Sequence, residues 1–106
     1  MQLKECVRLR DLNPQISLAA LVVNSIFLKL APKVNCTITS ANDSKHMKGS
    51  LHYKGAAIDF RTKDFPEDKK TLLVSEVQGA LGPEFDVLLE YPGEDNEHLH
   101  VEYDPG

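Results

Sequence analysis

The 106-residue sequence lacks three features that would each define a class of protein. It has no excess of basic residues: the formal net charge is −4 and no long basic run occurs, so we expect no nucleic-acid binding. Its only cysteines, Cys6 and Cys36, form no CxxC pair, which excludes a zinc finger. Two isolated cysteines are expected to be reduced rather than joined in a disulfide.

A long hydrophobic run is also missing. The most apolar segment, 16–30, is interrupted by polar residues and is shorter than the roughly 20 residues of a membrane span. The residues before it include acids and a proline, unlike an export signal. We therefore expect no membrane association and a cytoplasmic or phage-encoded protein. The length predicts a single domain, residues 1–106, and we expect a monomer.

Two segments have the apolar spacing and the end signals of helices. Asn13 and Pro14 form a helix start and Pro32 ends the first segment, whose broad apolar face predicts a largely buried helix. The second lies within 64–82, with acids in its first turn and a Gly-Pro pair at its end. The apolar face of the first helix contains Ile16, Ala19, Ala20, Val23, Ile26, Phe27 and Leu30. The inner stripe of the second contains Leu73, Val77, Ala80 and Leu81.

The remaining chain is typical of strands joined by polar connections. Segments rich in β-branched or alternating apolar residues predict strands at 33–40, 56–60, 85–91 and 98–103. Residues 41–50 are polar and predict a loop. The order of elements predicts an α+β fold: a mostly antiparallel sheet of about four strands, with two main helices on one face.

Four side chains suited to metal binding occur in two stretches of the chain, 49–61 and 96–104. His52 precedes Asp59 by seven residues, and His98 and His100 alternate along one strand, so both point to the same face. Two histidines and one carboxylate suit Zn²⁺ and leave a fourth position for water. On an ideal strand Glu97 faces away from His100, but a turn before the strand could bring it to the metal as a base.

Simpler interpretations of the same residues stay open. Asp59 could form a salt bridge with Arg61, its neighbour on the same face. Glu102 shares a face with His98 and His100 and could orient a metal ligand, or it could be a solvated strand residue.

Two motifs resemble one family of enzymes. The stretch SLHYKGAAIDFR, 50–61, resembles the S-x-H-x-x-G-x-A-x-D signature of the zinc D-alanyl-D-alanine peptidases. The stretch EHLHVE, 97–102, is similar to their second signature, in which a glutamate precedes the last histidine ligand by three residues. The resemblance covers roughly 37–104. It implies the Hedgehog/DD-peptidase fold, which also includes the L-alanyl-D-glutamate endopeptidases of phage lysins.

The resemblance implies roles for individual residues. His52, Asp59 and His100 are then the zinc ligands, Glu97 is the general base, and His98 lines the site and stabilises the transition state. Members of the family commonly supply an upstream cation, often an arginine, for the substrate or the oxyanion.

This sequence departs from the family at that cation. No arginine lies between Asp11 and Arg61, so Lys45 and His46 are the nearest replacements. Ser50, the first residue of the signature, is a further candidate for substrate contact.

The function implied is a zinc-dependent peptidase. Its substrate would be a peptidoglycan stem peptide or a small peptide with a D-residue, cut as a D-Ala-D-Ala carboxypeptidase or an L-Ala-D-Glu endopeptidase would cut it. The alternative is a catalytically silent domain of the same fold, in which zinc stabilises a binding module or a structural component of a virion.

Overall fold

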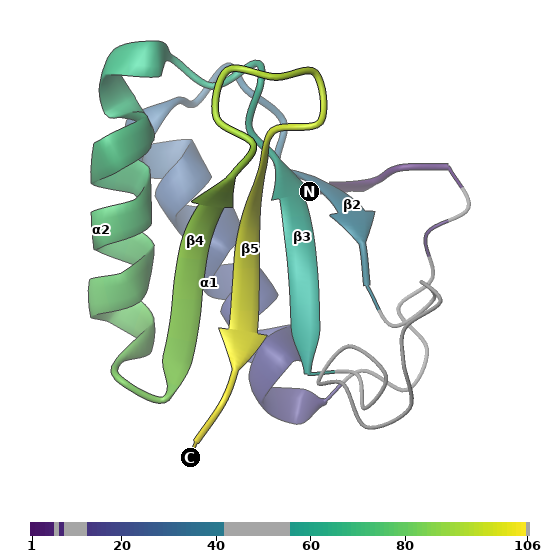
Figure 1. The fold of residues 1–106 in the computed structure, drawn as a ribbon, viewed down its shortest axis with the longest axis vertical. Helices are drawn as coiled ribbons and strands as arrows, with labels where there is room; N and C mark the ends of the chain where they lie inside the picture. Colours follow the sequence, from purple (N-terminus) through teal and green to yellow (C-terminus); the bar gives the residue numbers. More distant parts are fainter. Residues whose placement is uncertain (6, 8–12, 42–55, 106) are drawn as a thin grey trace.

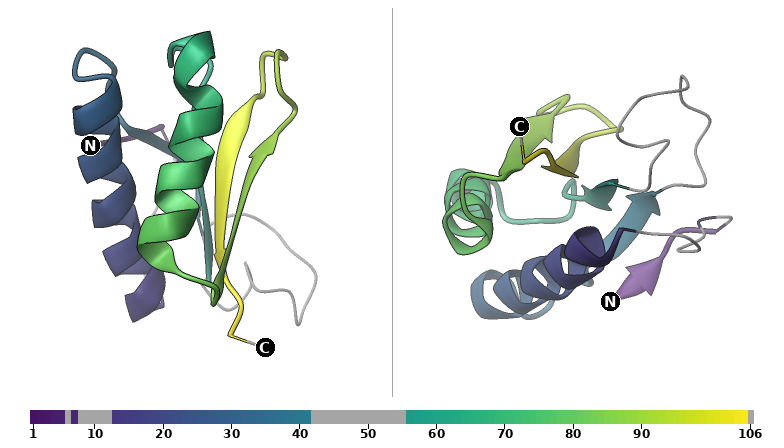
Figure 2. Two further views of the ribbon diagram at one scale, coloured as in Figure 1. Left: turned by 90° about the vertical axis from the view of Figure 1, so that its left-hand side faces the viewer. Right: turned by 90° about the horizontal axis from the view of Figure 1, so that it is seen from below.

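The structure, a computed structural model, describes residues 1–5, 7, 13–41 and 56–105. Within these ranges, two helices cover one face of a five-stranded sheet (Figures 1 and 2). The strand order is β1-β2-β3-β5-β4, with β1 and β2 parallel and every other pair antiparallel. The strands are β1 (Gln2–Leu3), β2 (Thr37–Ser40), β3 (Ala57–Arg61), β4 (Phe85–Glu90) and β5 (His98–Tyr103).

The predicted α+β class is confirmed, and the sheet differs in one strand. The sequence predicted about four strands and missed β1, which has two residues and pairs in parallel with β2. Two residues are too few for an alternating pattern, so only the pairing itself identifies this strand.

Helix α1 (Pro14–Leu30) begins as the sequence predicted. The Asn13 side chain accepts a hydrogen bond of 2.8 Å from the Gln15 amide, and the seven residues of the predicted apolar face are its buried residues. The expectation that this helix is largely buried is wrong. Leu18, Leu21 and Leu28 are 64%, 60% and 58% exposed, because helices and sheet form only two layers and α1 packs on one side.

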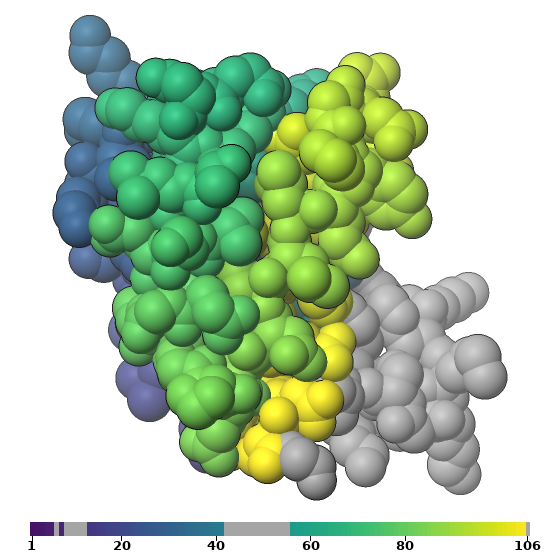
Figure 3. Space-filling view, turned by 60° about the vertical axis from the view of Figure 1, so that its left-hand side comes forward, coloured from purple at the N-terminus to yellow at the C-terminus, as the bar shows by residue number. Residues whose placement is uncertain are grey.

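The second predicted helix is divided. A 3-10 turn, η1 (Glu67–Lys69), leads into α2 (Lys70–Leu81), which ends at Gly82 with φ of 90°. Leu73 and Val77 are buried as predicted, but Ala80 is exposed. An ion pair of 2.7 Å between Lys29 and Glu76 joins the two helices. Figure 3, viewed from the side of α2, shows this helix in green, packed along the edge strand β4.

The core lies between the helices and the sheet. Ile58, Phe60, Leu99 and Val101 are fully buried there. Alternate residues of a strand point to opposite faces, so the residues between these four lie on the face away from the helices. Hydrophobic packing on one side of the sheet thereby fixes which side chains occur on the other.

Two further sequence predictions concern membrane-spanning helices and the chemical state of the cysteines. Neither described helix is long and apolar enough to cross a membrane. Cys36 is a free thiol, and burial raises its pKa to about 12, which keeps it protonated. Cys6 lies outside the described residues.

Candidate metal centre

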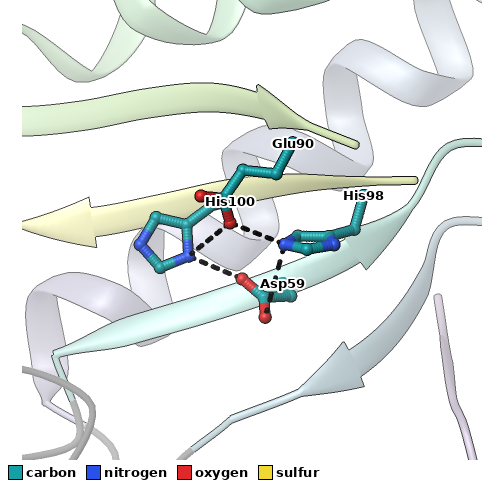
Figure 4. A group of neighbouring side chains, drawn as sticks. All are labelled: Asp59, Glu90, His98 and His100. Atoms are coloured by element: carbon teal, nitrogen blue, oxygen red, sulfur yellow. Dashed lines mark hydrogen bonds and ion pairs between the residues drawn. The ribbon is translucent and has the colours of Figure 1, made fainter. Parts of the chain in front are cut away.

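Four side chains converge on the sheet face away from the helices (Figure 4). Asp59 comes from β3, His98 and His100 from β5, and Glu90 from β4. The strand register brings them together, because Asp59 pairs with His100 and Glu90 pairs with His98 across neighbouring strands. Each residue offers a ligand atom within 4.8 Å of the others, and we refer to these four residues as the metal group.

Short contacts connect the metal group. The His100 Nδ1 atom lies 2.7 Å from Asp59 Oδ1, and His98 Nε2 lies 2.7 Å from Glu90 Oε1. Two longer ion pairs of 3.9 Å link His98 to Asp59 and His100 to Glu90. The side chains are largely shielded, except that of Glu90, which is 40% exposed.

His100 is held from both sides by carboxylates. Its Nε2–H donates to Glu102 Oε1 at 2.9 Å, opposite the contact with Asp59. The bond to Asp59 raises the pKa of His100 to about 9; burial opposes this shift, and Glu102 and the charge of Glu90 add to it. Of the two interpretations of Glu102, the structure supports the one in which it orients His100.

The donor set fits a divalent cation such as Zn²⁺. With both imidazoles neutral, three carboxylates, Asp59, Glu90 and Glu102, give this region three negative charges. If a metal displaces the proton of Nδ1, next to Asp59, the bond to Glu102 keeps the remaining proton of His100 on Nε2. Imidazole nitrogen and carboxylate oxygen are ligands that Zn²⁺ takes in proteins.

The predicted base Glu97 lies outside the metal group. Its side chain is 1% exposed, and its carboxylate accepts hydrogen bonds from Thr62 at 2.7 Å and from the Gly93 amide at 2.8 Å, and pairs with Lys70 at 2.7 Å. Burial alone would raise the pKa of Glu97, but the bonds from Lys70, Gly93 and Thr62 outweigh it and lower the pKa. The catalytic role of Glu97 stays a prediction.

The other predicted site residues are divided by what the structure describes. Asp59, His98 and His100 are brought together, and Asp59 faces the histidines rather than forming an ion pair with Arg61. The remaining predicted residues lie outside the described ranges: Lys45, His46, Ser50 and His52.

Glu90 is the residue that the sequence reasoning missed. It ends the strand FDVLLE and has no motif of its own. The signal was present in the hairpin: if 85–90 pairs with 98–103 across a short turn, Glu90 lies opposite His98 on the same face.

Fold and site together define a class: an α+β domain whose sheet carries a histidine and carboxylate group suited to a metal. The model of the Hedgehog amino-terminal signalling domain matches residues 8–101. The chain therefore belongs to this family, which has the Hedgehog/DD-peptidase superfamily fold and is related to zinc peptidases. No curated protein matches the sequence.

Proposed function

We propose that the chain is a zinc-dependent peptidase that hydrolyses an amide bond in a short peptide, such as a peptidoglycan stem peptide. One observation carries this proposal. Glu90, a carboxylate beyond the predicted ligands, belongs to the metal group and its side chain is 40% exposed. A site that only held a metal would not require this partly solvated acid.

The ligands proposed are Asp59 and His100, with His52 added by the resemblance of its signature. A bound Zn²⁺ supplies Lewis acid chemistry, polarising the scissile carbonyl and lowering the pKa of a water molecule toward about 7. Glu102 keeps His100 in the tautomer that presents Nδ1. The chain therefore contributes both the donor atoms and the hydrogen bond that orients one of them.

Glu90 is the base that we propose in place of Glu97. A general base must reach the proton it removes and must have free acceptor capacity. Glu97 has three donors on its carboxylate and is buried, whereas the contacts of the Glu90 carboxylate within the described residues are with the histidines of the metal group. Glu90 takes the proton of the attacking water and delivers it to the leaving amine.

His98 lies next to this base and contacts it directly. Its Nδ1–H donates to the Asn96 carbonyl oxygen at 2.9 Å, while Nε2 faces the Glu90 carboxylate at 2.7 Å. The short contact of Nε2 with Glu90 holds that carboxylate in place next to the metal group. His98 thereby orients the proposed base and lines the site where the oxyanion would form.

The test compares two isosteric variants. Peptidoglycan fragments are incubated with zinc-loaded protein, with and without a chelator, and products are identified by mass spectrometry. We expect Glu90→Gln to lower hydrolysis by about 10²- to 10⁴-fold with an unchanged zinc content. We expect folded Glu97→Gln to keep its activity within about tenfold. If folded Glu97→Gln is inactive and Glu90→Gln is active, the base is Glu97.

A second candidate function is a zinc-stabilised binding module without turnover. The match to a signalling domain family favours it. In that case wild type and Glu90→Gln bind zinc equally and neither cleaves any fragment. Chelator-sensitive release of a fragment of defined mass by wild type rules this candidate out.

A further inference from the structure

The exposed leucines of α1 lie together on the side of the helix opposite its buried face. Successive residues of an α-helix are turned by about 100°, so Leu18, Leu21 and Leu28 lie on the side away from the fully buried Val23. Ser25 lies on the same side and is exposed as well. We refer to Leu18, Leu21, Ser25 and Leu28 as the outer stripe.

The exposed side of α1 carries almost no charge. Lys29 is the only charged residue of this helix, and it is already paired with Glu76 of α2. The exposed side of a surface helix normally carries charged residues, and a continuous apolar patch there marks a contact surface. Leu72 is 45% exposed and lies one turn before Glu76, so it extends the patch onto the side of α2 that faces α1.

This patch lies on the opposite side of the molecule from the metal group. The two helices form one layer on the sheet, and the metal group lies on the other face of that sheet (Figure 2). Among the elements of the described residues, none forms a third layer over the helices. A partner that covers the outer stripe therefore leaves the metal group open to solvent.

The spacing of the outer stripe fits a second copy of the same helix. Its members are separated by three, four and three residues, so the stripe is the same when read in either direction. In an antiparallel pair with twofold symmetry, Leu18 of one copy lies opposite Leu28 of the other. Leu21 then lies opposite Ser25, whose small side chain leaves room for the leucine and allows the close approach of two helices.

We propose that the outer stripe of α1 binds the outer stripe of a second copy of this chain, forming an antiparallel twofold dimer. The proposal replaces the monomer expected from the sequence and is independent of the peptidase function. A contact along this 17-residue helix, about 25 Å long and 10 Å wide, buries roughly 1,000 Å² when both copies and Leu72 are included. This area is at the lower limit of specific interfaces, so we expect a dissociation constant of about 1–100 μM.

A membrane surface fits the outer stripe less well than a second copy. Helices that lie on membranes carry several lysine or arginine residues beside their apolar face. Helix α1 has only Lys29, whose charge is paired with Glu76, and the chain has a formal net charge of −4. The charge pattern therefore favours a protein partner over an anionic lipid surface.

Sedimentation equilibrium from about 1 to 500 μM protein tests the proposal, in a chelator that prevents association through metal ions. We expect an equilibrium between monomer and dimer. Leu21→Glu places a charge in the middle of the stripe and should weaken the dimer at least about tenfold. The control is Leu88→Glu, which changes a leucine that is 53% exposed on the metal-group face of the sheet. It should alter the dissociation constant by less than about twofold.

A pair of charge variants tests the antiparallel arrangement. Leu18→Lys and Leu28→Glu each place a charge against a leucine of the second copy, so each protein alone should dimerise at least about tenfold more weakly than wild type. In a mixture, the introduced lysine lies opposite the introduced glutamate. The mixed dimer should therefore be at least about fivefold tighter than either dimer of a single variant. Thermal unfolding verifies that each variant is folded.

The outcomes either support or overturn the dimer. A wild-type chain that stays monomeric at the highest concentration overturns it, as does an unchanged dissociation constant in folded Leu21→Glu. An equal loss in Leu88→Glu would show that the association does not use α1. A mixture no tighter than its components overturns the antiparallel arrangement. If wild type is monomeric and binds vesicles of phosphatidylcholine and phosphatidylserine, and Leu21→Glu does not, lipid covers this face instead of a second copy.

Discussion

Two charged clusters meet at the start of β5, and they differ in how completely their charges are matched. On the helix side, Glu97 pairs with Lys70 in an ion pair with side chains only 1% and 6% exposed. On the other side, the metal group presents its carboxylates and histidines next to two cavities, and Glu90 is 40% exposed. Adjacent residues, Glu97 and His98, belong to different clusters because neighbours on a strand face opposite ways.

The difference teaches how to separate structural acids from functional ones. The Glu97 carboxylate has its acceptor positions filled by donors, which stabilises the ionised form and makes it a weak base. The metal group has more carboxylates than cations, so it favours a dication or a proton. Satisfied charge holds the fold, and unmatched charge is available for chemistry.

The largest effect is expected from breaking the structural cluster. Glu97→Ala leaves Lys70 buried, with only the exposed Glu67 as its acid partner, so we expect a loss of about 3 kcal/mol in the free energy of unfolding. Urea denaturation measures this loss. Glu90→Gln should change stability by less than about 1 kcal/mol. Equal stabilities of the two variants would contradict the comparison.

A pH titration of the metal-free protein probes the other cluster. The folded pKa of His100 is raised from 6.5 to about 9. The contribution of protonated His100 to the free energy of unfolding is therefore complete below about pH 6.5 and is lost as the pH rises toward 9. At 1.36 kcal/mol per pKa unit, the loss is on the order of 3 kcal/mol. Chemical denaturation at several pH values in chelator measures it, and His100→Gln should remove the dependence.

Zinc affinity should depend on pH through the same proton of His100. The metal needs Nδ1 of His100 unprotonated, so binding displaces one proton below pH 9, and the measured affinity should rise by up to tenfold per pH unit. A pH-independent affinity between pH 7 and 8.5 would show that His100 is not a ligand.

A smaller effect is expected from the residue that orients His100. Glu102→Ala removes the acceptor at Nε2, and we expect zinc affinity to fall about 10- to 100-fold. Competition with a chromogenic chelator measures the affinity. The control is Asp86→Ala, an exposed acid paired with Glu102 across β4 and β5, which should change the affinity less than twofold. Equal losses in both variants would indicate a general charge effect.

Local patterns predicted most of the fold. The Asn13-Pro14 start and the buried face of α1 follow from spacing along a single helix. The exposed leucines of α1 could not be predicted in the same way, because exposure depends on how many layers pack together. Strand β1 depends on a parallel partner 35 positions away in the sequence, and no local signal encodes that pairing.

Site residues were predicted where they follow from alternation along a single strand, and one was missed where it depends on the pairing of two strands. Alternation placed His98 and His100 on one face, and the same parity predicted that Glu97 faces away from them on an ideal strand. The family motif outweighed that parity in the choice of base. Glu90 required the register of β4 against β5, which depends on the length of the turn.

The strand that carries both histidines is interior to the sheet, with β3 on one side and β4 on the other. Amides of such a strand are protected by two neighbours and exchange with deuterium only when a large part of the domain opens. The two histidines therefore lie on a strand whose amides we expect to exchange among the slowest in the domain. Removing a bound metal with a chelator and adding it back should then leave this strand folded.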